Sequence, residues 1–168
     1  HVSSAKELIY AKNNPIKKQV TVEVTPHHLF MDENDIKSLG AFAEMKPRLK
    51  TEHDQNALWN GIQNGDVDII ATDHAPHTKE EKEQANYPFG VPGLETMLPL
   101  LLDAFNNNNK ITLQKIMKLC CENPAKIFKI RNKGLIKEGF DADLVIVDLE
   151  KRQAVRNEDL LTKCKWSP

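Results

Sequence analysis

The chain has 168 residues and a formal net charge of −1, from 23 lysines and arginines against 24 aspartates and glutamates. This length is enough for one domain with a buried core, and the balanced charge gives no reason to expect nucleic acid or an anionic membrane as a partner. No apolar run approaches the about 20 residues that a membrane-spanning helix needs. The three cysteines lack metal-site spacing and leave an odd thiol, which is typical of a reducing compartment, so we expect a soluble, cytoplasmic protein.

Both ends of the chain are abrupt. His1 is followed directly by Val-Ser-Ser, with no initiator methionine and no signal-like segment, and the chain stops at Ser167-Pro168. We therefore expect a piece of a longer protein.

The first third of the chain predicts a helix followed by a strand. Ser4-Ala-Lys-Glu7 has the pattern of a capping box, and Asn13-Asn14-Pro15 is expected to end the helix that it starts. Residues 19–24 alternate β-branched and polar side chains, which predicts a strand, and a loop with Pro26-His27-His28 follows.

The middle of the chain repeats this order of helix and strand. Thr51 and Asp54 predict a capped helix that closes at Asn64-Gly65. Residues 68–71 are apolar and lead into Thr72-Asp73-His74, as expected for a buried strand that delivers polar groups at its carboxyl end.

A loop and several helices are expected next. The charged, then Pro- and Gly-bearing, residues 79–92 predict a mobile loop, and residues 94–105 predict a buried helix kinked or restarted at Pro99. Thr112 predicts the cap of another helix, and Asn123-Pro124 predicts a cap and first-turn proline that start the next one.

The helical periodicity of the sequence ends near residue 131. Residues 134–139 and 143–148 lack helical periodicity and have the chemistry of a β-hairpin. We therefore predict two parts, parallel βα units in residues 1–131 and a β segment in residues 132–168. The βα units are too few to close an eightfold barrel, which typically takes about 250 residues, so they would supply only its last strands.

Five of the six histidines fall into three polar clusters at predicted strand ends. The clusters are His1 alone, Glu23 with His27 and His28, and Asp73 with His74 and His77. Carboxyl ends of parallel strands share one face, so these side chains can converge, and histidine with carboxylate suits zinc. Each histidine is equally compatible with an ordinary hydrogen-bonding or packing role, and spacing alone leaves both alternatives open.

The residues in and around these clusters resemble the sequence motifs of dihydroorotases, which belong to the amidohydrolase superfamily. The motifs occur in the same order, and the resemblance covers essentially the whole chain. The matching strings are HVSS at 1–4, EVTPHHLF at 23–30, TDHAPHT at 72–78 and PGLETMLPL at 92–100. The run GFDADLVIVD at 139–148 is similar to the carboxyl-terminal signature that amidohydrolases share.

The resemblance implies an α/β fold: the C-terminal part of a metal-dependent TIM-type (β/α)8 barrel, followed by strands of a small β domain. It implies a binuclear zinc site with His1 and Asp73 as ligands, Asp73 also carrying the proton, and Glu23 holding a further zinc. His77 and Lys46 would bind the substrate carboxylate, with Pro92 and Gly93 against the substrate ring; His27 and His28 would be structural. The remaining ligands would lie outside this chain, so we expect it to be inactive alone.

The implied activity is dihydroorotase: reversible zinc-dependent hydrolysis of dihydroorotate to N-carbamoyl-L-aspartate in pyrimidine biosynthesis. The alternatives are a hydantoinase or dihydropyrimidinase, and a non-catalytic scaffold for a transcarbamoylase. Retention of His1 and Asp73 argues against the scaffold. The resemblance also implies a homodimer, with association or fusion to aspartate transcarbamoylase, and leaves open whether the parent is a separate enzyme or one domain of a multifunctional chain.

Overall fold

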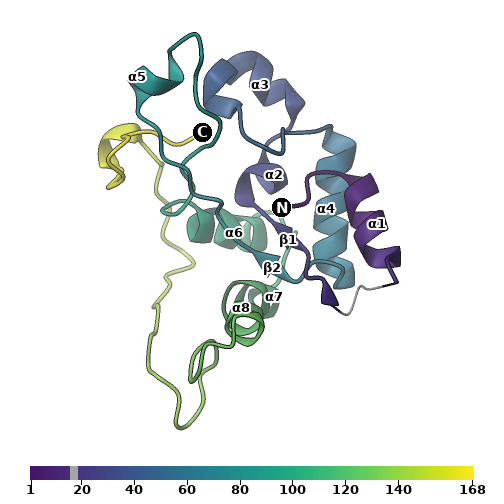
Figure 1. The fold of residues 1–168 in the computed structure, drawn as a ribbon. Helices are drawn as coiled ribbons and strands as arrows, with labels where there is room; N and C mark the ends of the chain where they lie inside the picture. Colours follow the sequence, from purple (N-terminus) through teal and green to yellow (C-terminus); the bar gives the residue numbers. More distant parts are fainter. Residues whose placement is uncertain (16–18) are drawn as a thin grey trace.

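The computed structural model describes residues 1–15 and 19–168, and two short parallel strands lie at its centre (Figure 1). Strand β1 (Glu23–Val24) pairs with β2 (Ile69–Ile70), with Glu23 opposite Ile69. Both predicted strands are confirmed in position, but the ladder takes in only two residues of each. Parallel neighbours need a long crossover, and here it is residues 25–68, which contain four helical segments.

The N-terminal residues lie along the other edge of β1. The Val2 N–H donates to the Glu23 carbonyl at 2.8 Å, whereas the Val24 carbonyl accepts from Ala71 on the β2 side. Successive carbonyls of a strand point to opposite neighbours, so β1 lies between the N-terminal segment and β2.

Capping boxes start both long helices beside this sheet, as predicted. Helix α1 (Ala5–Asn13) is capped by Ser4 and α4 (Glu52–Asn64) by Thr51, and α4 ends at Gly65 in the left-handed conformation with φ +80°. The two helices pack side by side (Figure 1), with buried Leu8 against α4.

The segments between β1 and α4 are short. They are α2 (Pro26–Phe30), α3 (Glu33–Leu39) and the 3-10 turn η2 (Gly40–Ala43). The main core gathers apolar side chains of the sheet and of α1, α2, α4, α6 and α7, namely Leu8, Val24, Leu29, Leu58, Trp59, Ile62, Ile70, Leu101, Ala104 and Ile116. A second cluster contains Ala43, Met45, Leu49, Val91, Cys164 and Trp166.

The helices after β2 correct two sequence predictions. Helix α6 (Met97–Asn106) begins late enough that Pro99 lies in its first turn, where a missing N–H is tolerated and causes no break. Asn123 does not cap a new helix, because α7 (Leu113–Met117), the π turn η3 (Lys118–Glu122) and α8 (Asn123–Ile127) run on in helical conformation. The Asn123 amide instead donates to the Asp68 carbonyl at 2.7 Å. Within the described residues, no helix is both long and apolar enough to cross a membrane.

The predicted β-hairpin is not formed. Of the described residues, none in 132–168 is in a strand, and this part holds one regular turn, η4 (Asn157–Asp159). The apolar side chains of residues 144–147 are open to solvent, with Ile146 98% exposed. After α8 the chain runs away from the body as an extended loop and returns beside α5 (Lys79–Lys82) (Figure 1). A strand forms only where its backbone groups find a neighbouring strand, and this segment has none.

Candidate active site

Three of the predicted site residues meet at the sheet. His1 lies between two carboxylates: its Nδ1 is 2.5 Å from Oε1 of Glu23 and its Nε2 is 3.1 Å from Oδ1 of Asp73. The three residues come from three adjacent segments: His1 from the N-terminal residues, Glu23 from β1 and Asp73 from the segment after β2. The predicted convergence of these three residues at the sheet is therefore confirmed.

Asp73 reaches His1 through an unusual backbone conformation. It has φ +46°, in the left-handed region that non-glycine residues rarely adopt, although aspartate and asparagine do so more readily than others. Such conformations cost free energy and cluster at functional sites. In this conformation the Asp73 carboxylate lies 3.1 Å from Nε2 of His1.

The donor atoms of His1 and Asp73 fit a shared metal ion. Two ligand atoms at about 2.0 Å from a tetrahedral zinc lie about 3.3 Å apart, close to the 3.1 Å between Nε2 of His1 and Oδ1 of Asp73. In the described part of the chain, no three His, Cys, Asp or Glu side chains are grouped so that they could hold an ion by themselves. His1 and Asp73 could thus supply at most part of a ligand set.

Glu23 contacts the far side of the His1 ring. Histidines that bind metals usually donate their other ring N–H to a carboxylate, which fixes the tautomer and the ring orientation. Nδ1 of His1 against Glu23 has this arrangement, and Nε2 is the ring nitrogen that faces Asp73. A direct bond from Glu23 to a further zinc stays a prediction.

Gly93 lies against the residue that precedes Asp73, and Pro92 lines a small pocket with Gly93 and His74. A Cβ on Gly93 would be 3.5 Å from the Thr72 carbonyl, an ordinary contact distance. The backbone N–H groups of Gly93 and Leu94 both donate to Nδ1 of His74, at 3.1 and 3.2 Å. His74 therefore anchors this turn through an unprotonated ring nitrogen, a role that the sequence analysis did not assign.

His77 and Lys46 meet at Phe89. Nε2 of His77 donates to the Phe89 carbonyl at 3.2 Å, and Nδ1 is 3.6 Å from Glu81. The Lys46 ammonium lies 4.2 Å from the centre of the Phe89 ring. The structure thus brings the two predicted carboxylate-binding side chains to one residue, but no contact joins His77 to His1, Glu23 or Asp73 within the described residues.

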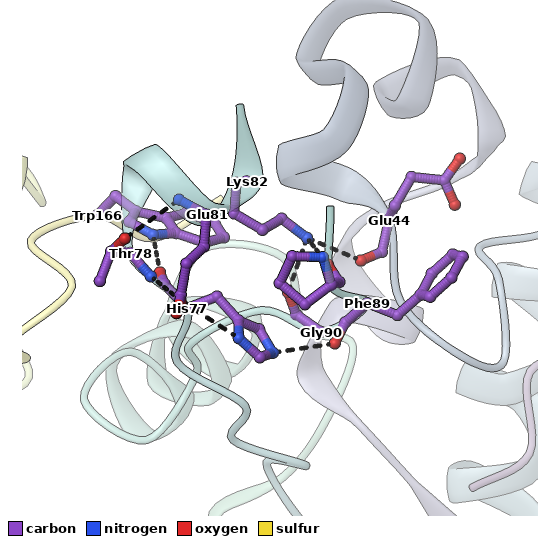
Figure 2. Close-up of polar contacts among 9 residues, drawn as sticks. Glu44, His77, Thr78, Glu81, Lys82, Phe89, Gly90 and Trp166 are labelled. Atoms are coloured by element: carbon purple, nitrogen blue, oxygen red, sulfur yellow. Dashed lines mark hydrogen bonds and ion pairs between the residues drawn. The ribbon is translucent and has the colours of Figure 1, made fainter. Parts of the chain in front are cut away.

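Lys82 anchors the loop that carries Phe89. This side chain is fully buried, and its Nζ donates to three backbone carbonyls, of Pro88 at 2.9 Å, Gly90 at 3.0 Å and Glu44 at 3.2 Å (Figure 2). Burial lowers the pKa of the Lys82 ammonium, while the nearby Glu44 carboxylate opposes that shift. Residues 79–92, predicted to be a mobile loop, are therefore tied to the body at a buried point.

His27 and His28 are buried, and their contacts fit the predicted structural role. Nε2 of His28 donates to the Pro47 carbonyl at 2.9 Å, and its Nδ1 is 2.7 Å from the Thr25 hydroxyl. Burial, and the neighbouring His28, lower the pKa of His27 to about 3. Both rings are thus part of the buried interior of the protein.

No local sequence pattern indicated a role for two of these residues, Lys82 and Phe89. Lys82 stands in the run Lys79-Glu-Glu-Lys82, which looks like a solvated face, and Phe89 stands in a Pro- and Gly-bearing segment. The capping box Thr78-Lys-Glu-Glu81 was a readable signal for the short helix α5 that carries Lys82. A cavity of about 540 Å³ between α6 and residues 148–160 contains none of the predicted site residues.

The amino-acid sequence of the chain is similar to those of known dihydroorotases. The chain is 45% identical over 168 residues to the dihydroorotase of Pyrococcus furiosus, covering 100% of this chain and 39% of that protein. It is 41% identical over 150 residues to the dihydroorotase of Halobacterium salinarum, covering 88% of this chain and 35% of that protein. The chain thus spans well under half the length of these relatives.

Two solved hydantoinase structures have a similar fold. The L-hydantoinase (dihydropyrimidinase) of Arthrobacter aurescens superposes with a TM-score of 0.87 at 29% identity, over 94% of this chain and 37% of that one. The D-hydantoinase of a Thermus species, at 24% identity and a TM-score of 0.84, shows the same fold. The model of the amidohydrolase family matches residues 2–165, and the chain therefore belongs to the amidohydrolase family.

Proposed function

We propose that the protein containing this chain is a dihydroorotase, which reversibly hydrolyses dihydroorotate to N-carbamoyl-L-aspartate. The observation that carries the proposal is the meeting of His1, Glu23 and Asp73 in a chain 41–45% identical to proteins named dihydroorotase. The retained His1 and Asp73 disfavour a non-catalytic scaffold.

The proposed fold of the parent is a TIM-type (β/α)8 barrel, of which residues 1–131 form the last βα units and residues 132–168 join a small β domain. The parallel pair β1 and β2 supports this, as does the likeness to the hydantoinases. Active sites of such barrels lie at the carboxyl ends of the strands, where Asp73 follows β2.

The proposed cofactor is zinc in a binuclear site, held in this chain by His1 and Asp73, with the remaining ligands elsewhere in the parent. A further zinc beside Glu23 belongs to the same proposal. Zinc, when bound, supplies the Lewis acidity that hydrolysis of an amide at neutral pH needs.

Asp73 is the proposed proton carrier. Its carboxylate accepts a proton from the attacking water and delivers it to the ring nitrogen that departs when the cyclic amide opens. Glu23 holds His1 in the orientation that keeps Nε2 directed at Asp73. His77, Lys46, Pro92 and Gly93 are proposed to bind the anionic substrate, with His77 and Lys46 directed at its carboxylate.

A hydantoinase is the second candidate, because the solved structures with the best superposition described above carry that name. Their identity to the chain is 29% or less, against 41–45% for the dihydroorotases. A homodimer, association or fusion with aspartate transcarbamoylase, and a cytoplasmic location are further parts of the proposal.

The experiment compares the full-length parent protein with its Asp73→Asn variant on dihydroorotate and on hydantoin. Asparagine tolerates the positive φ of Asp73 but cannot carry the proton, so turnover of dihydroorotate should fall by about 10²–10⁴-fold with an unchanged circular dichroism spectrum. Near-normal turnover by the variant would refute the proton-carrier role. Cleavage of hydantoin but not dihydroorotate would replace the proposal by the second candidate.

A further inference from the structure

We propose that Lys82 is a positioning residue for substrate binding, which holds His77 and Lys46 in place through Phe89. This inference rests on the proposed function, since it concerns the side chains assigned to the substrate carboxylate. It adds a residue whose ammonium acts inside the protein and makes no contact with substrate.

The ammonium of Lys82 is fully satisfied by the loop around it. An ammonium has three N–H donors, and those of Lys82 have three carbonyl acceptors, Glu44, Pro88 and Gly90. The Glu44 carbonyl also accepts the Gly90 N–H at 2.9 Å. Through these hydrogen bonds, Lys82 links α5 to the backbone at Gly90 and to the backbone at Glu44.

Phe89 stands between the two carbonyls that Lys82 holds in its own loop. With Pro88 and Gly90 fixed on either side, the Phe89 carbonyl points at Nε2 of His77 (Figure 2). The Phe89 side chain carries the Lys46 ammonium on its ring face, a contact that is attractive for a cation. One backbone unit thus sets the position of both proposed substrate-binding side chains.

The packing around the loop leaves little room for another arrangement. Gly90 has φ +119°, and a Cβ there would lie 2.5 Å from the Cβ of Ala75. The Trp166 indole N–H donates to the His77 carbonyl at 2.7 Å, so the returning C-terminal segment holds the other side of His77 (Figure 2). Loss of the Lys82 bonds leaves the Pro88 and Gly90 carbonyls without a donor, and burial of such groups is unfavourable.

In the part of the chain that the structure describes, the hydrogen bonds and ion pairs of the Asp73 and His1 side chains do not include Lys82 or Phe89. Their positions come from β2 and from the segment beside β1, and their contacts are with each other and Glu23. Loss of Lys82 is therefore expected to weaken substrate binding while the chemical step persists.

The test is Lys82→Met in the zinc-loaded full-length protein, because methionine has similar length and no donor. We expect the KM for dihydroorotate to rise at least about tenfold with kcat within about threefold, the pattern of lost binding that is equal in ground and transition states. Hydrogen–deuterium exchange of peptides covering residues 83–92 should become faster, with α4 unchanged. Lys79→Met, on the same helix and half-buried, is the matched control and should alter neither quantity.

Two results would overturn the inference: an unchanged KM with a lowered melting temperature, or a fall in kcat alone. If Lys82→Met does not fold, the Phe89→Leu variant is measured instead. Phe89 is 42% exposed, and this substitution removes the contact with Lys46. An unchanged KM for Phe89→Leu would also overturn the inference. Absence of dihydroorotate turnover in the wild type would instead refute the proposed function, and the exchange rates would still report whether Lys82 holds the loop.

Discussion

At the scale of single residues, the site depends on one histidine with two different carboxylate neighbours. Asp73 contacts the ring nitrogen that suits a metal, and Glu23 contacts the other. The two acids therefore have distinct expected roles although both lie within hydrogen-bond distance of His1. Substitution of each separates these roles.

Glu23→Gln in the full-length protein is expected to weaken zinc binding about 10–100-fold, the usual effect of losing a carboxylate behind a metal-binding histidine. The amide keeps the size of the side chain but not its charge. Titration of the metal-free protein with zinc in competition with a chelator measures the change. Glu33→Gln, at an exposed position of α3, is the control, and equal affinities for both variants would contradict the role of Glu23.

His27 predicts a pH dependence of stability. Its pKa falls from 6.5 to about 3 in the folded state, through burial and then the neighbouring His28. Below pH 6.5 the unfolded chain binds a proton that the folded chain excludes, so this contribution to stability is present above pH 6.5 and is lost as the pH falls. Between pH 8 and pH 5 the loss amounts to about 2 kcal/mol.

His27→Gln removes that titration, so urea unfolding of the full-length protein should lose less stability between pH 8 and pH 5 than the wild type does. His28, whose pKa burial also lowers, keeps part of the dependence in the variant. His53→Gln, in the exposed first turn of α4, should behave as the wild type. If the free energy of unfolding varied identically with pH in His27→Gln and in the wild type, His27 would not be a source of the pH dependence.

At the scale of elements, helix starts are set by local side chains that also join neighbouring helices. Asp54 completes the capping box of α4 and accepts the Ala5 N–H of α1 at 2.9 Å. The α1–α4 pair, which covers one side of the sheet, is thus fixed at its N-terminal ends by one carboxylate.

Asp54→Ala is expected to lower the free energy of unfolding by about 2 kcal/mol, since it removes half of a capping box and leaves the Ala5 N–H without its acceptor. Thr51→Ala, which removes only the cap, should cost about 1 kcal/mol. Chemical denaturation of the full-length protein compares both with Glu52→Ala, an exposed neighbour that should change little. Equal effects of Asp54→Ala and Glu52→Ala would show that the carboxylate does not join the helices.

At the scale of the whole molecule, the chain exposes a run that resembles a buried strand. Leu144, Val145 and Ile146 are 63%, 73% and 98% exposed, and the chain spans 35–39% of the two relatives described above. Contiguous apolar exposure of this kind marks a surface that another segment covers. We expect the remaining part of the parent to pair with residues 143–148.

Ile146→Glu tests this expectation. In the full-length protein it should lower the free energy of unfolding by about 2 kcal/mol or more, because a charge would replace a buried side chain. In the 168-residue chain, where Ile146 is exposed, the same substitution should change stability by less than about 0.5 kcal/mol. Equal effects in both chains would show that the run stays exposed in the parent.

The sequence by itself determined the features that depend on near neighbours. Capping boxes at Ser4 and Thr51 and the glycine at Gly65 set helix ends, because the groups that satisfy a helix terminus lie within a few residues of it. Alternation of side chains located β1, and the apolar run before Asp73 located β2. The parallel order of these strands then followed, and with it the convergence of His1, Glu23 and Asp73.

Tertiary structure decided what depends on distant partners. Lys82 is buried with its ammonium bonded to two carbonyls of its own loop and to the Glu44 carbonyl, 38 residues away in sequence. No local pattern distinguishes it from the exposed charges beside it. Asn123 continues a helix because its side chain bonds Asp68, 55 residues away in sequence. Residues 143–148 have the sequence of a strand without its structure, since a strand needs a hydrogen-bonding neighbour that this part of the chain does not provide.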